Sequence, residues 1–131
     1  CMKRSILVVE NDPMSRRLAE RVLTAGGYDV ACVGDAETAL ESARAHRPDL
    51  VLMDVRLPGM DGLEATRRLL ADPATADVAV AALSAQAFDE DVRSALDAGC
   101  VDYLTKPIGA RELLERVARI LDGDGAEKAG R

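Results

Sequence analysis

Short apolar runs alternate five times with segments of helical periodicity, and this alternation restricts the fold more than any other feature of the chain. The expected strands are 5–9, 28–33, 49–54, 77–84 and 101–105. Two of them, SILVV and DLVLMD, are almost wholly apolar, which is typical of strands covered on both faces. The pattern therefore predicts an α/β fold with a five-stranded, doubly wound parallel sheet, (βα)5.

Proline, glycine and acidic residues mark the ends of five expected helices. These helices cover 13–25, 35–45, 61–71, 88–98 and 110–122. Because proline is favoured at the first helical position, Pro13 makes Asp12 the natural N-cap of the first helix. Asp35 can cap the second helix, and Asp61 can begin the third in a capping box with Glu64. The first helix has apolar residues at helical spacing: Met14, Leu18, Val22 and Ala25.

Composition excludes several classes of function. The 131 residues suit one domain, expected over 4–122, with a disordered tail over 123–131. A net charge of -6 and a pI near 4.8 argue against direct binding to nucleic acid. No apolar run reaches the roughly 18 residues of a membrane span, and CMKR leads into a strand rather than a signal peptide. Cys32 and Cys100 lack CxxC spacing, which favours small buried side chains in a reducing cytoplasm.

Polar side chains follow the first, third, fourth and fifth expected strands. They are Glu10, Asn11, Asp12, Asp54, Ser84 and Lys106. In sheets of this kind ligands bind at the carboxyl ends of the strands. Hard oxygen ligands suit Mg²⁺, a lysine suits transferred oxygens, and a carboxylate can act as a nucleophile. The set is therefore what the handling of a phosphoryl group requires.

The chain resembles the receiver domains of bacterial two-component response regulators, of the stand-alone, single-domain type. The resemblance rests on VVEND, LMDVRLPGMDG, ALSA and DYLTKP in this order and spacing. It implies a flavodoxin-like strand order 2-1-3-4-5 and a phosphoacceptor, Asp54, which receives a phosphoryl group from a sensor histidine kinase or a histidine phosphotransfer protein. It also implies that Lys106 pairs with this carboxylate, usually before a cis bond to Pro107. Ser84 would bond the phosphoryl group, and Tyr103 matches an aromatic residue whose rotamer changes on activation.

One position departs from the family pattern. Two consecutive acidic residues usually follow the first strand, but here Asn11 stands in the second place, after Glu10. The resemblance then implies a metal shell of the Asp54 carboxylate, the Asn11 side-chain oxygen, the Arg56 backbone carbonyl and waters held in part by Glu10. An amide oxygen is a hard ligand without charge, so we expect Mg²⁺ to bind more weakly than with two acids.

Several alternatives stay open from the sequence. Asn11 alone supports a degenerate receiver that binds partners without phosphorylation. We expect no enzyme activity beyond assistance to the chain's own phosphorylation and dephosphorylation. A downstream protein partner is expected on the face of the fourth helix, fifth strand and fifth helix, and a weak homodimer there is left open. His46 is expected to be solvated. Five arginines are either kinase contacts or solvated side chains: Arg16, Arg17, Arg21, Arg67 and Arg68.

Overall fold

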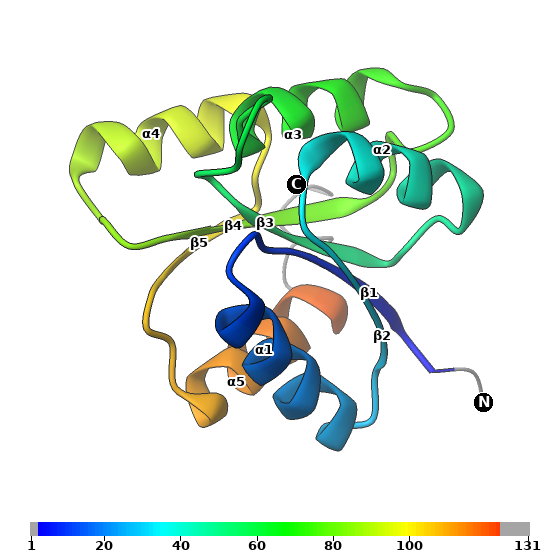
Figure 1. Ribbon diagram of the computed structural model, residues 1–131, viewed down its shortest axis with the longest axis vertical. Helices are drawn as coiled ribbons and strands as arrows, with labels where there is room; N and C mark the ends of the chain where they lie inside the picture. Colours follow the sequence, from blue (N-terminus) through cyan, green and yellow to red (C-terminus); the bar gives the residue numbers. More distant parts are fainter. Residues whose placement is uncertain (1–2, 124–131) are drawn as a thin grey trace.

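The computed structural model describes residues 3–123, which form a parallel sheet between two layers of helices (Figure 1). The strands are β1 Ser5–Val9, β2 Asp29–Val33, β3 Leu50–Asp54, β4 Ala79–Ser84 and β5 Asp102–Thr105. The helices are α1 Pro13–Ala25, α2 Ala36–Ala45, α3 Gly62–Ala71, α4 Asp89–Ala98 and α5 Ala110–Leu121. The strand order β2-β1-β3-β4-β5 confirms the predicted topology.

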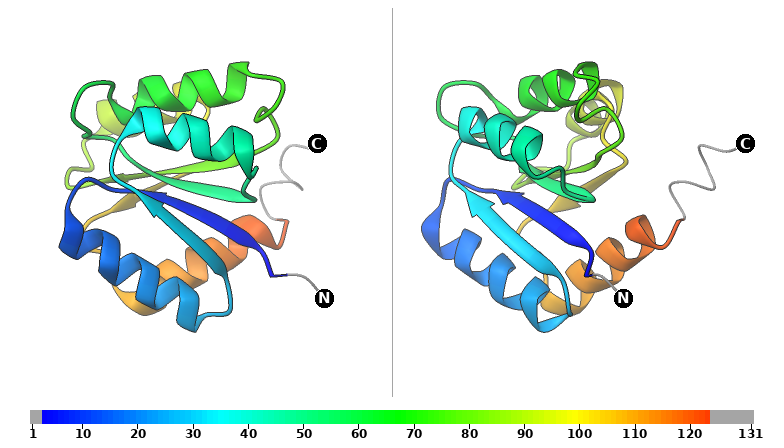
Figure 2. Two further views of the ribbon diagram at one scale, coloured as in Figure 1. Left: turned by 45° about the vertical axis from the view of Figure 1, so that its right-hand side comes forward. Right: turned by 90° about the vertical axis from the view of Figure 1, so that its right-hand side faces the viewer.

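Each face of the sheet has its own hydrophobic core, because alternate residues of a strand point to opposite faces. On one face Leu7, Val9 and Met53 pack with buried side chains of α2, α3 and α4. On the other face Ile6 and Leu52 pack with side chains of α1 and α5. Figure 2 shows these two layers from further directions, with α2, α3 and α4 above the sheet and α1 and α5 below it. This double coverage accounts for the continuously apolar strands.

Aspartates begin three of the helices, as the sequence predicts. Asp12, Asp35 and Asp61 each accept a hydrogen bond from the backbone N–H three residues later, at 2.9, 2.7 and 2.8 Å. Each bond satisfies a donor that the first turn of a helix leaves unpaired. Glu64, expected in a capping box, instead pairs with Arg68 at 3.0 Å. The caps therefore fix where α1, α2 and α3 leave the edge of the sheet.

The apolar stripe of α1 is largely exposed near the start of the helix. Met14 is 80% exposed and Leu18 57%, whereas Leu23 is fully buried against the sheet. Apolar side chains of α1 lie on two neighbouring stripes, and the angle at which the helix packs decides which stripe meets the sheet. The sequence therefore predicted the helix but not the orientation of its apolar face.

The described residues extend only slightly beyond the first strand and the last helix. The helices and strands run from Ser5 to Leu121, and of the predicted tail only Gly123 falls within the described residues. Across residues 3–123, no helix has both the length and the apolar character needed to cross a bilayer.

Cys100 is buried as expected, whereas Cys32 is only half-buried because β2 is an edge strand.

Candidate functional site

The carboxyl ends of four strands bring together polar side chains that are far apart in sequence. Glu10 follows β1, Asp54 ends β3, Ser84 ends β4 and Lys106 follows β5. These positions are neighbours because β3 pairs with β1 and β4, and β4 pairs with β5. The first three side chains are buried. The predicted convergence at this edge is therefore present.

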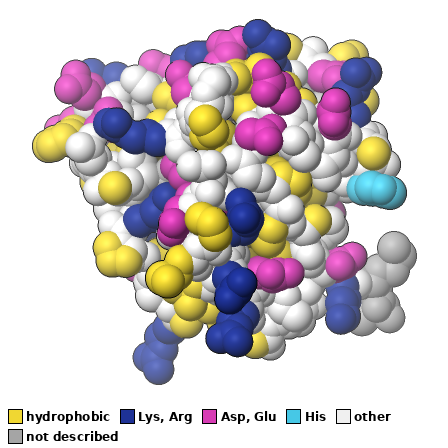
Figure 3. Space-filling view, viewed as in Figure 1, with side chains coloured by type: hydrophobic (Ala, Val, Ile, Leu, Met, Phe, Trp, Pro, Cys, Tyr) yellow, Lys and Arg dark blue, Asp and Glu magenta, His cyan; other side chains and the backbone are white. Residues whose placement is uncertain are grey.

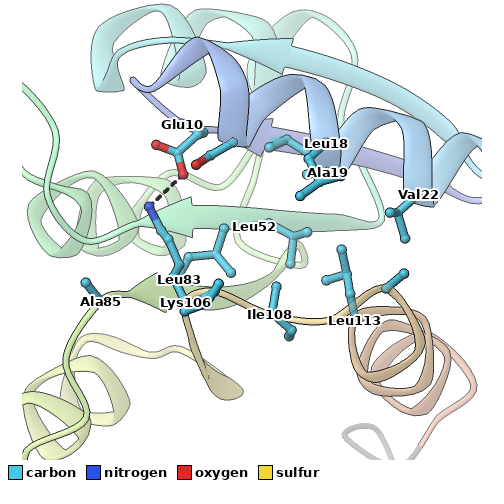
Figure 4. A pocket seen from close by; sticks show the side chains of 14 residues that line it. Glu10, Leu18, Ala19, Val22, Leu52, Leu83, Ala85, Lys106, Ile108 and Leu113 are labelled. Atoms are coloured by element: carbon cyan, nitrogen blue, oxygen red, sulfur yellow. Dashed lines mark hydrogen bonds and ion pairs between the residues drawn. The ribbon is translucent and has the colours of Figure 1, made fainter.

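Lys106 joins the two buried carboxylates. Its Nζ donates to Glu10 Oε1 at 2.6 Å, as Figure 4 shows, and to Asp54 Oδ2 at 3.0 Å. The side chains of Glu10 and Asp54 are 4% and 7% exposed, so water does little to stabilise either charge. Removal of one partner from such a buried group leaves a charge uncompensated, which is costly. The bond between Lys106 and Pro107 is cis, as the resemblance implies.

The pKa values of this cluster follow from its burial and its pairing. Burial raises the pKa of the Glu10 carboxyl above its ordinary value, and the neighbouring Asp54 adds to this effect while Lys106 opposes it. Burial also opposes the charge of Lys106, but its bonds to the two carboxylates outweigh this and raise its pKa. Lys106 is therefore held as a cation at neutral pH.

The three polar residues after β1 have three different surroundings. Glu10 is buried, and its Oε2 accepts the backbone N–H of Asp12 at 3.0 Å. Asn11, between Glu10 and Asp12 in the chain, is exposed. Asp12 accepts hydrogen bonds from the backbone N–H and the hydroxyl of Ser15, which hold the pKa of Asp12 below its usual value. The prediction of Asp12 as an N-cap is therefore confirmed, and its carboxylate is committed to α1.

The donor set at this edge fits a hard divalent cation. Glu10 and Asp54 carry two buried negative charges against the one positive charge of Lys106, so an excess of negative charge remains. Carboxylate and amide oxygens are ligands that Mg²⁺ accepts. Within residues 3–123 no group of three or more acidic, histidine or cysteine side chains is arranged to hold a metal. An ion here would therefore need oxygens other than those of acidic side chains to complete its coordination.

Gln86 was not predicted from the sequence as a site residue. It connects three residues around Asp54, the candidate phosphoacceptor. Its backbone N–H donates to Ser84 Oγ at 3.2 Å, and its carbonyl accepts the Tyr103 hydroxyl at 2.6 Å. Its side-chain oxygen accepts Arg56 Nη2 at 3.3 Å, while the Arg56 backbone N–H donates to Asp54 Oδ1 at 3.0 Å. The sequence signal that could have identified Gln86 is a polar residue two positions beyond the end of β4.

Arg16 differs from the expectation of a solvated side chain. Its Nη1 donates to the backbone carbonyl of Glu10 at 2.9 Å, and the residue is partly buried. Arg17 and Arg21 on the same helix are exposed, as is His46 at the end of α2. Arg16 therefore fixes the backbone at the end of β1.

An apolar cavity of about 360 Å³ lies beside the site, between α1 and α5. Leu52 and Leu83 line it from the sheet, Leu18 and Val22 from α1, and Leu113 from α5 (Figure 4). Glu10 and Lys106 of the site also line it. In Figure 3 hydrophobic and basic side chains gather over the lower half of the molecule, where α1 and α5 lie. The exposed start of α1 therefore leaves an apolar opening next to the buried carboxylates.

Comparison with known proteins agrees with this arrangement. The model of the response regulator receiver domain family matches residues 6–118. The DNA-binding response regulator MtrA of Mycolicibacterium smegmatis is 41% identical over 116 residues, which are 88% of this chain and 50% of MtrA. The chain thus spans about half the length of that relative. The polar-differentiation response regulator DivK of Brucella anthropi is 34% identical over 120 residues, 92% of this chain and 98% of DivK.

A solved structure has the same fold. The receiver domain of a sensor histidine kinase from Pseudomonas aeruginosa PAO1, with a magnesium ion coordinated in its active site cleft, has a TM-score of 0.85 to this chain. It is 38% identical, and the match covers 92% of this chain and 99% of that one. Fold, sheet-edge residues and family match lead to one conclusion: the chain belongs to the receiver domain family of response regulators.

Proposed function

We propose that the chain is a phosphorylatable receiver of a two-component system, in which Asp54 accepts a phosphoryl group from a sensor histidine kinase or a histidine phosphotransfer protein. The observation that carries the proposal is the cluster in which Lys106 bonds both Glu10 and Asp54. A carboxylate held beside a lysine in a buried, charged site is a suitable nucleophile. The cytoplasmic setting expected from the cysteines is part of the same proposal.

The chemistry assigned to the chain is acceptance of a phosphoryl group. An oxygen of the Asp54 carboxylate attacks phosphorus, and the bond from phosphorus to the donor nitrogen breaks as the acyl phosphate forms. Lys106 and the Ser84 hydroxyl then stabilise the charge on the phosphoryl oxygens. Because Asp54 is itself the acceptor, the chain assists its own phosphorylation and dephosphorylation and is not a turnover enzyme.

Four groups are assigned to hold Mg²⁺: Asp54, the Asn11 side-chain oxygen, the Arg56 backbone carbonyl and, through water, Glu10. The ion, when bound, supplies charge neutralisation for the phosphoryl oxygens. Asn11 contributes an oxygen but no charge, so the ion binds more weakly than it would with aspartate there. The excess negative charge of the buried cluster supports a cation at this place.

The output is a change in partner binding at the face formed by α4, β5 and α5. Phe88, Leu96 and Val101, at α4 and before β5, are exposed apolar side chains, as expected for a surface that a protein partner covers. The Tyr103 hydroxyl bonds the loop that carries Gln86, which links this face to Ser84. Phosphorylation then shifts the population of this face between two arrangements.

Phosphotransfer profiling against the histidine kinases of the organism tests the proposal. We expect rapid labelling of the wild-type chain by one kinase or phosphotransfer protein and no labelling of Asp54→Ala. The second candidate is a degenerate receiver, favoured by Asn11 at the second acidic position. Partner binding that is unchanged by Asp54→Ala and by the phosphodonor would support that alternative and contradict the first.

A further inference from the structure

Gly62, the first residue of α3, lies directly against the backbone of Asp54. A Cβ atom at position 62 would overlap the carbonyl oxygen of Asp54 and lie 2.9 Å from its carbonyl carbon. It would also lie 3.0 Å from Cγ of Met53. The N–H of Gly62 donates to the carbonyl of Val55 at 3.0 Å. Only a residue without a side chain allows α3 to begin this close to the end of β3.

Both sides of this contact are fixed by other interactions. On the strand side, the N–H of Val55 donates to the Leu83 carbonyl at 2.9 Å, which continues the pairing of β3 with β4. On the helix side, the buried Thr66 hydroxyl donates to the Gly62 carbonyl at 2.8 Å. The buried side chain of Leu69 anchors the same helix in the core. An added methyl group would therefore have to displace backbone, since it meets no flexible side-chain end that could yield.

We propose that Gly62 is a positioning residue for the phosphoacceptor, an inference that rests on the proposed role of Asp54. Its bare backbone lets α3 hold the segment from Asp54 to Arg56 in place. That segment contains the acceptor carboxylate, whose Oδ1 accepts the Arg56 N–H at 3.0 Å and whose Oδ2 faces Lys106. A backbone shift of about 1 Å at a reacting group can cost on the order of 10²-fold in rate.

The variant Gly62→Ala tests this assignment. The measurement is the maximal rate of phosphorylation by acetyl phosphate at saturating Mg²⁺, divided by the folded fraction found by circular dichroism. We expect a fall of about 10- to 100-fold. The matched control is Gly26→Ala, where the added methyl group meets the end of the Leu114 side chain, 2.6 Å away, at the far end of α1. Gly26→Ala is expected to lose stability and keep the wild-type rate.

Three results decide between the inference and its alternatives. Equal normalised rates for Gly62→Ala and wild type would overturn it, and so would an equal loss in Gly26→Ala. If the wild-type chain itself takes no phosphoryl group on Asp54, the proposed function fails rather than the positioning role alone.

If Gly62→Ala does not fold, Thr66→Val replaces it as the deciding variant. This change removes the hydroxyl that holds the Gly62 carbonyl and adds no bulk. We expect a several-fold lower maximal rate in a folded protein, restored by Thr66→Ser. A wild-type rate in Thr66→Val would then overturn the inference.

Discussion

Glu10 and Asp12 lie two residues apart at the same edge of the sheet, yet Glu10 is buried against a lysine and Asp12 caps a helix in solvent. The same contrast separates Asp54, at the end of β3, from Asp61, at the start of α3. An acid at a strand end is buried and shares the partly buried cation Lys106, whereas an acid before a helix accepts backbone N–H groups. Whether an acid follows a strand or precedes a helix, rather than whether it is Asp or Glu, therefore decides its role.

The pKa values of Glu10 and Asp12 move in opposite directions. Burial raises the pKa of Glu10, and the bonds from Ser15 lower that of Asp12. A group with a lowered pKa stabilises the fold above its unfolded value, and the stabilisation is lost as the pH falls through its folded value. We therefore expect changes in the buried cluster to alter phosphorylation and changes in the helix caps to alter stability. Four variants test this division of roles.

The largest effect is expected when the shared cation is removed. Lys106→Gln takes away the donor to both Glu10 and Asp54, and loss of such a charge-stabilising donor costs on the order of 10²-fold or more in rate. Initial rates of phosphorylation by acetyl phosphate at fixed Mg²⁺ measure it. Lys3→Gln, at an exposed position outside the site, is the matched control. A fall in rate of less than about threefold would show that Lys106 takes no part in phosphoryl transfer. The contrast between the buried cluster and the helix caps would then fail.

A smaller effect is expected from restoring the second acid. Asn11→Asp adds a negative charge next to Glu10 in the chain, so the Mg²⁺ concentration that gives half-maximal phosphorylation should fall, by about tenfold for about 1.4 kcal/mol of added attraction. A magnesium titration of phosphorylation by a small phosphodonor measures the difference. Identical half-saturation in the two proteins would show that Asn11 does not contact the ion.

Asp102 offers a third case beside the buried cluster and the helix caps. It is paired with a cation, Arg116, but lies at the start of β5, outside the site. Arg116 bonds both of its oxygens, at 2.6 and 2.8 Å. Burial opposes its charge, but Arg116 outweighs this and lowers the pKa of Asp102. We expect Asp102→Asn to lower the free energy of unfolding by about 1–2 kcal/mol at pH 7.

The pH dependence of this loss is its signature. The stabilisation by Asp102 is complete above its ordinary pKa of about 3.8 and fades as the pH falls through the lower folded value. Urea unfolding at pH 7 and at acid pH measures the gap between Asp102→Asn and wild type. The exposed Asp29→Asn is the control. A gap that stays constant down to acid pH would contradict the ion pair.

The smallest effect is expected at the first helix cap. Asp12→Ala removes the acceptor for the backbone N–H of Ser15, so the melting temperature should fall slightly at neutral pH and converge with wild type as the pH drops through the lowered pKa of Asp12. Phosphorylation at saturating Mg²⁺ should be unchanged. If Asp12→Ala instead shifted the magnesium titration strongly, Asp12 would be acting as a metal ligand and the division of roles would fail.

The sequence predicted the features that depend on local chemistry. Apolar runs gave the strands, Pro13 identified Asp12 as a cap, and the ligand rule for parallel sheets brought Asp54 and Lys106 to one edge. Other features depend on how elements pack in three dimensions. The bond from Arg16 to the end of β1 and the close approach of Gly62 to β3 need the angle of a helix against the sheet, which a periodic pattern does not contain.

The most direct test is intact-mass measurement of the chain after incubation with acetyl phosphate, with and without Mg²⁺, beside Asp54→Asn. Borohydride reduction and peptide mapping then locate the modified residue. We predict the addition of a single phosphoryl group, dependent on Mg²⁺, at Asp54 and absent from Asp54→Asn. No Mg²⁺-dependent addition to the wild type, or the same addition to Asp54→Asn, would contradict the account.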